Sequence, residues 1–383
     1  MSHLHSTTLI GIVCVLLWLY LLLCRGGFWR ARLRREPPAN LRRVVAIVPA
    51  RNEATVINRS LCSLLAQTGV DLSVIVVDDH SQDFTSEIAY ETAGAAERLD
   101  RLTVIKARPL ADRWSGKLWA VQQGIDEAQK LQADFYLLTD ADVEHSPESV
   151  ASLVAIAESG QYDLASYMVK LYCQTSPERL LIPAFVYFFF QLYPPNWISD
   201  PRSKTAGAAG GCILIRPEAL QRVGALHSIR SEIIDDCALA REVKRSGGRV
   251  WLGLTDSAAS IRPYGSSAEI ERMIARTAFN QLRHSTFLLA IAVIGLLITY
   301  IAPVALAFGP SRWLAVIACM LMLISYWPMI RFYRLNPFWA LTLPLAAIFY
   351  MVSTLDSALR YWTGCGGQWK GRAQDTRPSR STS

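Results

Sequence analysis

Four apolar segments, one near the start and three near the end, most constrain what this chain can become. Thr7–Cys24 holds 18 residues without a charge, close to the ~20 that a helix needs to cross a bilayer. Phe287–Phe308, Trp313–Ile330 and Phe338–Leu355 are each long enough to cross as well, and the single proline in each is tolerated in lipid-embedded helices. The sequence therefore predicts a membrane protein with a water-exposed domain between these segments.

Basic residues follow the first apolar segment directly. Between residues 25 and 43 there are seven Arg and one Glu. A cleaved signal peptide is the alternative interpretation of Thr7–Cys24, but no Lys or Arg precedes the segment and no small-residue cleavage site follows it. Because basic flanks stay in the cytoplasm, we expect a retained anchor with its N-terminus outside. Basic residues beside apolar segments indicate membrane topology and argue against nucleic-acid binding.

The same charge rule conflicts with the end of the chain. Arg331 and Arg334 fit a cytoplasmic turn between the last two apolar segments. A further crossing would put the basic tail outside, and that tail contains Arg360, Lys370, Arg372, Arg377 and Arg380. Either the rule fails for this tail, or one late segment is re-entrant or interfacial.

Short β-branched runs alternate with helical periodicities in the middle of the chain. Val44–Val48 and Val74–Val77 are continuous apolar runs, typical of buried parallel strands. The remaining predicted elements are helices over Glu53–Gln67, Ser81–Ala93 and Lys117–Gln129 and strands over Leu102–Ile105 and Phe135–Leu138. This alternation predicts a doubly wound, mostly parallel α/β sheet, whose ligands bind beyond the carboxyl ends of the strands.

Acidic residues stand after three of these predicted strands. The groups are Pro49 to Glu53, Asp78 with Asp79, and Asp140 with Asp142. Carboxylates that meet at one edge repel one another unless a cation neutralises them, so the pattern favours a polyphosphate with Mg²⁺ or Mn²⁺. Helix capping is the alternative for the Asp78 pair. Lys117 opens a predicted helix, where its ammonium and the helix dipole favour phosphate.

Six sequence blocks resemble, in order, the motifs of family 2 glycosyltransferases with the GT-A fold. They are VAIVPARNEATVI, VIVVDDHSQD, SGKLWAVQQGI, LLTDADVE, AGAAGGCILIRPEAL and EIIDDCALAREVKRSG. The terminal apolar segments and the stretch RTAFNQLRHS are most similar to the hopene-associated branch. The resemblance implies an inverting, metal-dependent transfer of sugar from a nucleotide-diphosphate sugar to a lipid, such as a hopanoid or another isoprenoid or sphingolipid-like acceptor.

The resemblance also implies roles for individual residues. Asp78 and Asp79 would hold the nucleotide base, and Asp140 would approach the ribose and join Asp142 in the metal site. The other residues implied to bind the nucleotide or its diphosphate are Pro49, Glu53, Lys117, Arg276, Gln281 and Arg283. Many membrane members carry Gln-x-x-Arg-Trp where this chain has Gln-Leu-Arg-His. The roles of the last three residues therefore stay open.

Asp235 and Asp236 occupy the position of the family's Glu-Asp pair, whose second acid is the general base. A carboxylate opposite the leaving diphosphate can accept the proton of the acceptor hydroxyl. We therefore predict Asp236 as the catalytic base and keep Asp235 as the second candidate. Both acids also begin a predicted amphipathic helix, which is compatible with catalysis.

These predictions divide the chain into five regions. They are an anchor over 1–24, a basic linker over 25–43, a cytoplasmic GT-A domain over 44–286, about three transmembrane helices over 287–359 and a basic tail over 360–383. Leu180–Tyr193 is too short to span, and could be a core helix or an interfacial helix beside a lipid entry. We expect a multi-pass protein of the bacterial inner membrane. A nucleotidyltransferase, a polyprenyl-phosphate sugar transferase and a transporter or structural membrane protein remain alternatives.

Overall fold

The chain divides into two compact units. The computed structural model describes residues 2–37, 40–363, 368–369 and 372–373. The first unit, named here the sheet unit, comprises Arg32–Tyr172, Trp197–Arg262 and Gln368–Ser383. The second, named the helical unit, comprises Met1–Ala31, Cys173–Asn196 and Pro263–Gly367. The stretch 44–286, predicted as one domain, is therefore shared between the two units.

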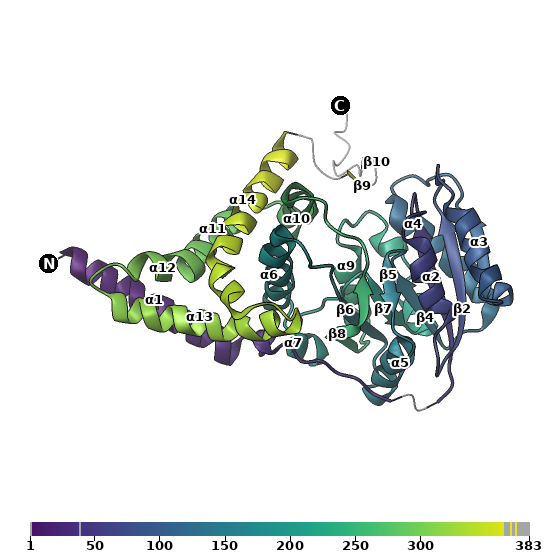
Figure 1. The fold of residues 1–383 in the computed structure, drawn as a ribbon, viewed down its shortest axis with the longest axis horizontal. Coiled ribbons are helices and arrows are strands. Elements are labelled where there is room, and N and C mark those ends of the chain that lie inside the picture. The colour runs from purple at the N-terminus through teal and green to yellow at the C-terminus, as the bar shows by residue number, and fades with distance from the viewer. Residues whose placement is uncertain (1, 38–39, 364–367, 370–371, 374–383) are drawn as a thin grey trace. The chain divides into compact units, whose positions relative to one another are not determined.

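An eight-stranded mixed sheet with the order β3-β2-β1-β4-β7-β6-β8-β5 forms the centre of the sheet unit (Figure 1). The strands are β1 (Arg43–Ala50), β2 (Asp71–Asp78), β3 (Leu102–Lys106), β4 (Phe135–Thr139), β5 (Val143–His145), β6 (Leu164–Lys170), β7 (Cys212–Ile215) and β8 (Val250–Ser260). From β3 to β4 the pairing is parallel, as predicted. β7 runs antiparallel to β4 and β6, and β5 runs antiparallel to β8. The α/β prediction is confirmed, and the strands from β3 to β4 have the predicted parallel arrangement.

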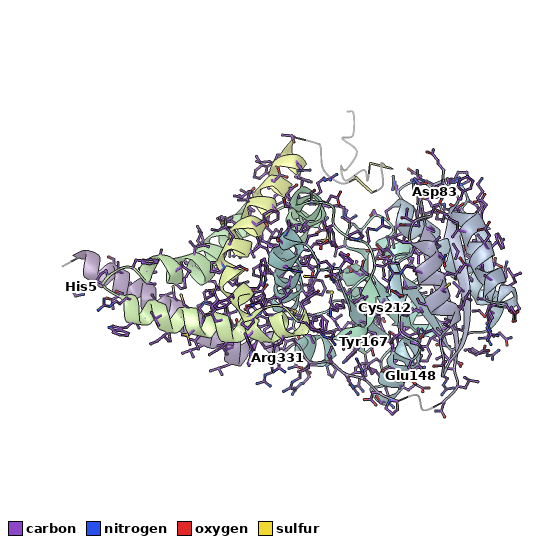
Figure 2. The ribbon with its side chains drawn as sticks, viewed as in Figure 1. His5, Asp83, Glu148, Tyr167, Cys212 and Arg331 are labelled. Atoms are coloured by element: carbon purple, nitrogen blue, oxygen red, sulfur yellow. The ribbon has the colours of Figure 1, made fainter. Side chains whose placement is uncertain are left out.

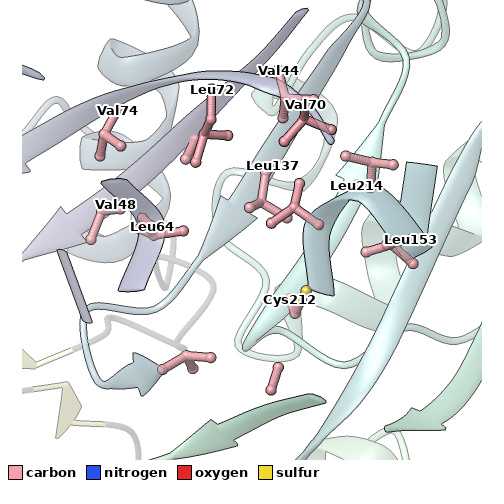
Figure 3. Packing of buried hydrophobic residues seen from close by; sticks show 14 of the residues in the cluster. Val44, Val48, Leu64, Val70, Leu72, Val74, Leu137, Leu153, Cys212 and Leu214 are labelled. Carbon is pink, nitrogen blue, oxygen red and sulfur yellow. The ribbon is translucent and has the colours of Figure 1, made fainter. Parts of the chain in front are cut away.

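Helices pack on this sheet and bury its strands. They are α2 (Ile57–Leu65), α3 (Thr85–Ala95), α4 (Gly116–Ala128), α5 (Ser149–Ser159), α8 (Pro217–Arg222) and α9 (Asp235–Arg245), with short 3-10 turns at Leu99–Arg101, Gln129–Leu131 and His227–Ile229. Every residue of β1 except Arg43 is buried. Figure 3 shows Val44, Val74 and Leu137 from adjacent strands packed in one cluster with Leu64 and Leu153 from the helices. Burial on both faces explains why these strands are continuous apolar runs.

The apolar segments form the helical unit. Its elements are α1 (Ser2–Cys24), a 3-10 turn at Phe28–Arg30, α6 (Ser176–Leu192), α10 (Ser267–Gln281), α11 (Thr286–Leu296), a π-helical turn η5 (Leu297–Ile301), α12 (Ala302–Leu306), α13 (Arg312–Phe332), η6 (Pro337–Thr342) and α14 (Leu343–Trp362). The short α7 (Pro195–Ser199) stands where the chain passes from one unit to the other. Within the described residues, four helices are long and apolar enough to cross a membrane: His5–Cys24, Thr286–Leu306, Arg312–Phe332 and Pro337–Trp362.

The N-terminal helix is an integral part of the helical unit. The Trp18 indole is fully buried and donates a hydrogen bond of 2.9 Å to the Thr299 carbonyl, and its ring meets the edge of Tyr300 at 5.6 Å. The Cys14 thiol contacts the carbonyl of Ile298 at 3.3 Å. A helix built into the unit in this way favours the retained anchor over a cleaved signal peptide.

The segment Leu180–Tyr193 lies mainly in α6, which packs among the apolar helices. The Tyr187 and Ser325 hydroxyls are 2.7 Å apart, and the Leu181 carbonyl accepts a hydrogen bond of 3.0 Å from the Tyr350 hydroxyl. Tyr187 also contacts the Tyr326 ring at 5.2 Å. α6 thus packs into the core of the helical unit, and a position beside a lipid entry stays a prediction.

Candidate active site

Strand-end acids gather at the carboxyl edge of the parallel half of the sheet. Ala50 at the end of β1 is in register with Asp78 at the end of β2, and Ile47 of β1 pairs with Leu138 near the end of β4. Asp140 follows β4 directly. Because the strands are parallel and in register, the residues that follow them meet at one edge, where such folds bind ligands.

Asp78 and Asp79 organise the loops at this edge. Asp78 accepts hydrogen bonds of 2.8 Å from the Ser81 backbone N–H and from the Ser86 hydroxyl. Asp79 is only 2% exposed, and the Arg51 guanidinium donates to its carbonyl at 2.7 Å and contacts its carboxylate at 3.4 Å. The capping alternative is not observed for Asp78, because α3 begins at Thr85 with Phe84 as its N-cap and no side-chain cap. A role of either acid in holding a nucleotide base stays a prediction.

A second carboxylate cluster is organised by Arg262, which follows β8. Its guanidinium contacts the Glu53 carboxylate and donates to Asp142 at 2.7 Å. The Asp83 carboxylate accepts the Ala54 N–H at 3.1 Å and so ties the loop after β1 to the loop after β2. Sequence reasoning missed Arg262 because no motif marks it. Pro49 is buried inside β1, and its part in a nucleotide pocket stays a prediction.

Lys117 joins the strand-end acids to the acids of α9. Its ammonium lies 2.6 Å from the Asp140 carboxylate. Burial alone would lower the pKa of Lys117, but the charges of Asp140, Asp235 and Asp236 outweigh it, and the pKa is raised above its usual value. Lys117 is therefore a permanent cation. The structure brings Asp140, Asp235 and Asp236 together around it.

Asp236 is the most strongly perturbed acid of this group. It lies in the first turn of α9, and its two carboxylate oxygens accept the backbone N–H groups of Gly210, at 2.8 Å, and Cys237, at 2.7 Å. Burial and the neighbouring charge of Asp235 raise the pKa of Asp236 to about 6. Asp235 accepts the Asp236 N–H at 3.1 Å. The predicted helix start is thus observed, and it holds one carboxylate in a defined orientation.

Gly210 permits the close approach of the backbone to Asp236. A Cβ at this position would lie 3.3 Å from the Asp236 Oδ2 atom, which is tighter than a relaxed contact between these atoms. Any larger residue would push the loop away from the carboxylate that its N–H contacts. The glycine is therefore part of the support of Asp236.

Asp140 and Asp142 fit a divalent metal only in part. Among the described residues, no group of three or more His, Cys, Asp or Glu side chains is arranged to hold a metal ion. The two carboxylates instead each pair with a cation, Lys117 and Arg262 respectively. Mg²⁺ typically uses one or two carboxylates and completes its shell with water and substrate phosphates. The two acids fit that donor set, with the diphosphate as co-ligand.

The other three predicted residues belong to the helical unit. Arg276 is exposed on α10, and Arg283 is exposed in the turn after it. The Gln281 side-chain oxygen accepts a hydrogen bond of 2.8 Å from the Tyr193 hydroxyl. Their part in clamping a diphosphate stays a prediction.

The sheet unit matches a known family model. Residues 45–224 match glycosyl transferase family 2. Probable glycosyltransferase YdaM of Bacillus subtilis is 28% identical over 191 residues, which cover 46% of this chain and 42% of that protein. Undecaprenyl-phosphate 4-deoxy-4-formamido-L-arabinose transferase of Yersinia enterocolitica is 30% identical over 130 residues, covering 32% of this chain and 36% of that protein. The chain thus spans less than half the length of these relatives.

A solved structure shares the fold. The mannosyltransferase PcManGT from Pyrobaculum calidifontis, in complex with GDP-Man and Mn²⁺, aligns with a TM-score of 0.54 and 17% sequence identity over 92% of this chain and 99% of that protein. The prediction of a family 2 glycosyltransferase domain with the GT-A fold is confirmed by these matches. The hopene-associated branch stays a prediction.

Proposed function

We propose that the protein is a membrane-bound inverting glycosyltransferase that moves a sugar from a nucleotide-diphosphate sugar to the hydroxyl of a lipid. The observation that carries this proposal is Asp236, a carboxylate with a pKa of about 6 that stands beside the Lys117 and Asp140 ion pair in a family 2 domain. An acid with a pKa just below neutral is mostly ionised at pH 7 and still accepts a proton readily.

Asp236 would act as the general base. Its two hydrogen bonds from Gly210 and Cys237 hold the carboxylate still, so that a proton lost by the acceptor hydroxyl has a fixed destination. Attack by that hydroxyl opposite the leaving diphosphate inverts the anomeric carbon in one step. Asp235 raises the pKa of Asp236 and thereby its basicity.

Lys117 and the start of α4 would receive the diphosphate. The Ser115 hydroxyl accepts the Leu118 N–H at 3.4 Å, which caps the helix, and the other N–H groups of the first turn point outward along the positive end of the helix dipole. The charged Lys117 side chain stands in this turn. The departing diphosphate would thus meet positive charge that the fold maintains before the substrate arrives.

Asp140 and Asp142 would hold Mg²⁺ or Mn²⁺ together with the diphosphate oxygens. When bound, such an ion neutralises the charge that builds on the departing phosphate. Arg262, which also contacts the Glu53 carboxylate, would hold the Asp142 carboxylate in position through its hydrogen bond.

The need for a base favours a hydroxyl acceptor over a phosphate acceptor. A lipid phosphate is an anion near neutral pH, so it can attack without losing a proton to the protein. Transfer to a polyprenyl phosphate is the second candidate, and the name of the Yersinia relative favours it. The four apolar helices and the adjacent Arg cluster support a bacterial inner-membrane protein with the sheet unit in the cytoplasm, where a hopanoid or another isoprenoid or sphingolipid-like lipid would be accessible.

Turnover by the purified protein in detergent tests these alternatives. UDP- and GDP-sugars with Mn²⁺ are incubated with a lipid alcohol or with polyprenyl phosphate, and the lipid product and the released nucleotide are identified by mass spectrometry. We expect a glycosylated alcohol and free nucleoside diphosphate, and loss of the product with Asp236→Asn. Release of pyrophosphate would indicate a nucleotidyltransferase, and undiminished transfer by Asp236→Asn would exclude the proposed base.

A further inference from the structure

In the helical unit α1 and α13 run in the same direction, and α11 with α12 runs antiparallel to both. Residues 307–311 join α12 to α13, so α11 begins at the end where α13 finishes. The Thr8 and Ser311 hydroxyls are 3.1 Å apart, which places the start of α1 beside that short connection. Figure 2 shows His5 and Arg331 at opposite ends of this group of helices.

These two ends differ in charge. The near end, defined by Cys24, Thr286 and Phe332, carries Arg25, Arg30, Arg283, Arg331 and Arg334. The far end, defined by the residues around Ser311, carries Arg312. Because Lys and Arg concentrate on the cytoplasmic side of membrane proteins, the near end is the cytoplasmic end.

The segment that forms η6 and α14 starts at the near end. Only residues 333–336 separate the last residue of α13 from Pro337. The five Cα-to-Cα steps from Phe332 to Pro337 reach at most about 18 Å, well short of the bilayer core, which is ~30 Å thick. Contacts between η6 and α13 keep the segment against that helix.

The same segment also ends at the near end. The Tyr361 ring stacks on His284 at a centroid distance of 4.0 Å, and Trp362 contacts the Phe279 ring at 5.6 Å. The Phe279 N–H donates to the Ser357 hydroxyl at 3.0 Å. His284 lies in the short turn before α11, and Phe279 lies near the end of α10, so the last two turns of α14 are close to the start of α11.

A crossing helix could not make both sets of contacts. The 20 residues of α14 extend about 30 Å, enough to carry its last turn to the level of Ser311 if it ran alongside α13. Figure 1 shows instead that α14 runs across the direction of α1 and α13. We propose that Pro337–Trp362 is a re-entrant segment, which enters the cytoplasmic leaflet of the bilayer and leaves it on the same side.

The exposed face of this segment fits the acyl chains of that leaflet. Its exposed large apolar residues recur every three or four positions: Phe338, Leu341, Leu345, Ile348, Val352, Leu355, Leu359 and Trp362. The opposite face, with Ala346, Tyr350 and Ser357, is buried against the other helices. Aromatic residues stand at both ends of the stripe, as in segments that meet the membrane–water boundary.

Charge also favours the lipid surface as the partner. Arg334 precedes the segment and the basic tail with Lys370 follows it, so both flanks can meet anionic headgroups. Arg360, inside the last turn, is paired with Asp356 and lies 3.3 Å from Glu271. Its charge is thereby compensated at the edge of the apolar layer.

The re-entrant segment resolves the conflict in the charge pattern. Three crossings, by α1, by α11 with α12, and by α13, leave the basic tail on the same side as the Arg cluster that follows α1. The two ends of the chain then face opposite sides of the membrane. This topology does not depend on the glycosyl-transfer chemistry. The topology proposal and the proposed function can therefore be tested, and refuted, separately.

Epitope tags in the full-length protein test this topology. Tags are placed before Met1, within 307–311, within 334–336 and after Ser383, and antibody access is compared in intact and permeabilised cells. We expect the first two tags to share one side and the last two to share the other. Tags within 334–336 and after Ser383 on opposite sides would show that α14 crosses and would overturn the proposal.

Cysteine labelling keeps the test decisive if a tag disturbs folding. Thr363→Cys, just beyond α14, and Phe308→Cys, at the far end, are treated in intact cells with a membrane-impermeant maleimide. The wild-type protein, whose exposed cysteines include Cys24 and Cys62, gives the background level of labelling. We expect added label with Phe308→Cys and none with Thr363→Cys. Added label with both variants would contradict the re-entrant segment.

Discussion

The sheet unit and the helical unit satisfy their buried polar groups in opposite ways. In the sheet unit the important partners are charged, such as Lys117 with Asp140 and Arg262 with Asp142. In the helical unit they are neutral, such as Tyr187 with Ser325 and the Tyr300 hydroxyl with Gln191 at 2.8 Å. Charges that face water and a charged substrate can be held in ion pairs, whereas a segment inside lipid must satisfy its polar groups without net charge.

This difference separates substrate chemistry from membrane attachment. Removing a charged group at the edge of the sheet should change turnover and leave the folded protein intact. Removing a neutral hydrogen bond in the helical unit should change stability and leave turnover intact. Five measurements, ordered by the size of the change that we expect, test this division.

Replacing the proposed base should have the largest effect. Asp236→Asn keeps the size of the side chain and removes the proton acceptor, so we expect transfer to a hydroxyl acceptor to fall by about 10²–10⁴. Because the pKa of Asp236 is raised to about 6 in the folded protein, ionising this buried carboxylate costs stability. The stability of the wild type therefore falls as the pH rises from the pKa of the unfolded chain to about 6. The variant removes this cost but leaves only one oxygen for the N–H groups of Gly210 and Cys237, so its melting temperature at pH 7.5 should stay close to that of the wild type. Asp235→Asn is the matched control, with a smaller loss of rate.

Removing the central cation should have the next largest effect. Lys117→Met keeps the aliphatic stem and leaves Asp140 without its partner at 2.6 Å. A positioned cation stabilises the charge that builds on the departing diphosphate, and removing one such group lowers kcat by about 10²–10³, so we expect turnover at saturating donor to fall by about 10²-fold. Lys130→Met is the control, because Lys130 pairs with Glu127 on the exposed surface of the same unit. Equal losses in the two variants would show that charge near this edge has no specific role.

The pH profile should report the same groups. Asp236 must be ionised to accept a proton, so kcat/KM for a hydroxyl acceptor should fall by about tenfold per pH unit below its pKa, which is about 6. The charge of Lys117 lowers the pKa of Asp236, and Lys117→Met should move the acidic limb of the profile to higher pH. If the acidic limb is unchanged in that variant, the charge of Lys117 does not influence the ionisation of the proposed base.

A small change in the glycine loop should have a moderate effect. In Gly210→Ala the new Cβ would lie 3.3 Å from Asp236 Oδ2, so the loop must shift by a few tenths of an ångström. We expect kcat to fall by about 10-fold, because a misplaced catalytic group costs rate steeply, with little change in KM for the donor. Gly94→Ala is the control, because nothing lies within 4 Å of a Cβ there.

A neutral contact in the helical unit should have the smallest effect. Tyr187→Phe removes the hydroxyl that lies 2.7 Å from Ser325. Hydrogen bonds between membrane helices contribute about 0.6 kcal/mol on average, so the midpoint of unfolding in detergent should decrease slightly while turnover stays unchanged. A loss of turnover comparable to that of Gly210→Ala would contradict the separation between the two units.

Much of the secondary structure could be predicted from sequence. The predicted strand Val44–Val48 lies within β1 and the predicted helix Lys117–Gln129 almost coincides with α4, because local periodicity reports which face of an element is buried. The strand order beyond β4 could not be predicted. The β7 run Cys212–Ile215 is buried and apolar, as parallel strands are, yet it pairs antiparallel with β4. Pairing direction depends on where the chain returns to the sheet.

Some residues of the candidate site could likewise be predicted from the sequence, and others could not. Asp140, Asp142 and Asp236 could be proposed because motif spacing and strand ends mark them. Arg262 could not, because it is 209 residues from Glu53 and 120 residues from Asp142 along the chain. Its role arises only when β8 ends beside the loop that follows β4.

By itself the sequence determined which segments are apolar enough to leave water, where strands and helices form, and which acids stand at strand ends, because these follow from the order of neighbouring residues. The tertiary structure decided which cation meets which carboxylate. Our proposal that the segment from Pro337 to Trp362 returns to the side on which it started also rests on tertiary contacts. The physical reason is that hydrophobic length permits a crossing but sets no direction, and direction comes from contacts such as those of Tyr361 with His284.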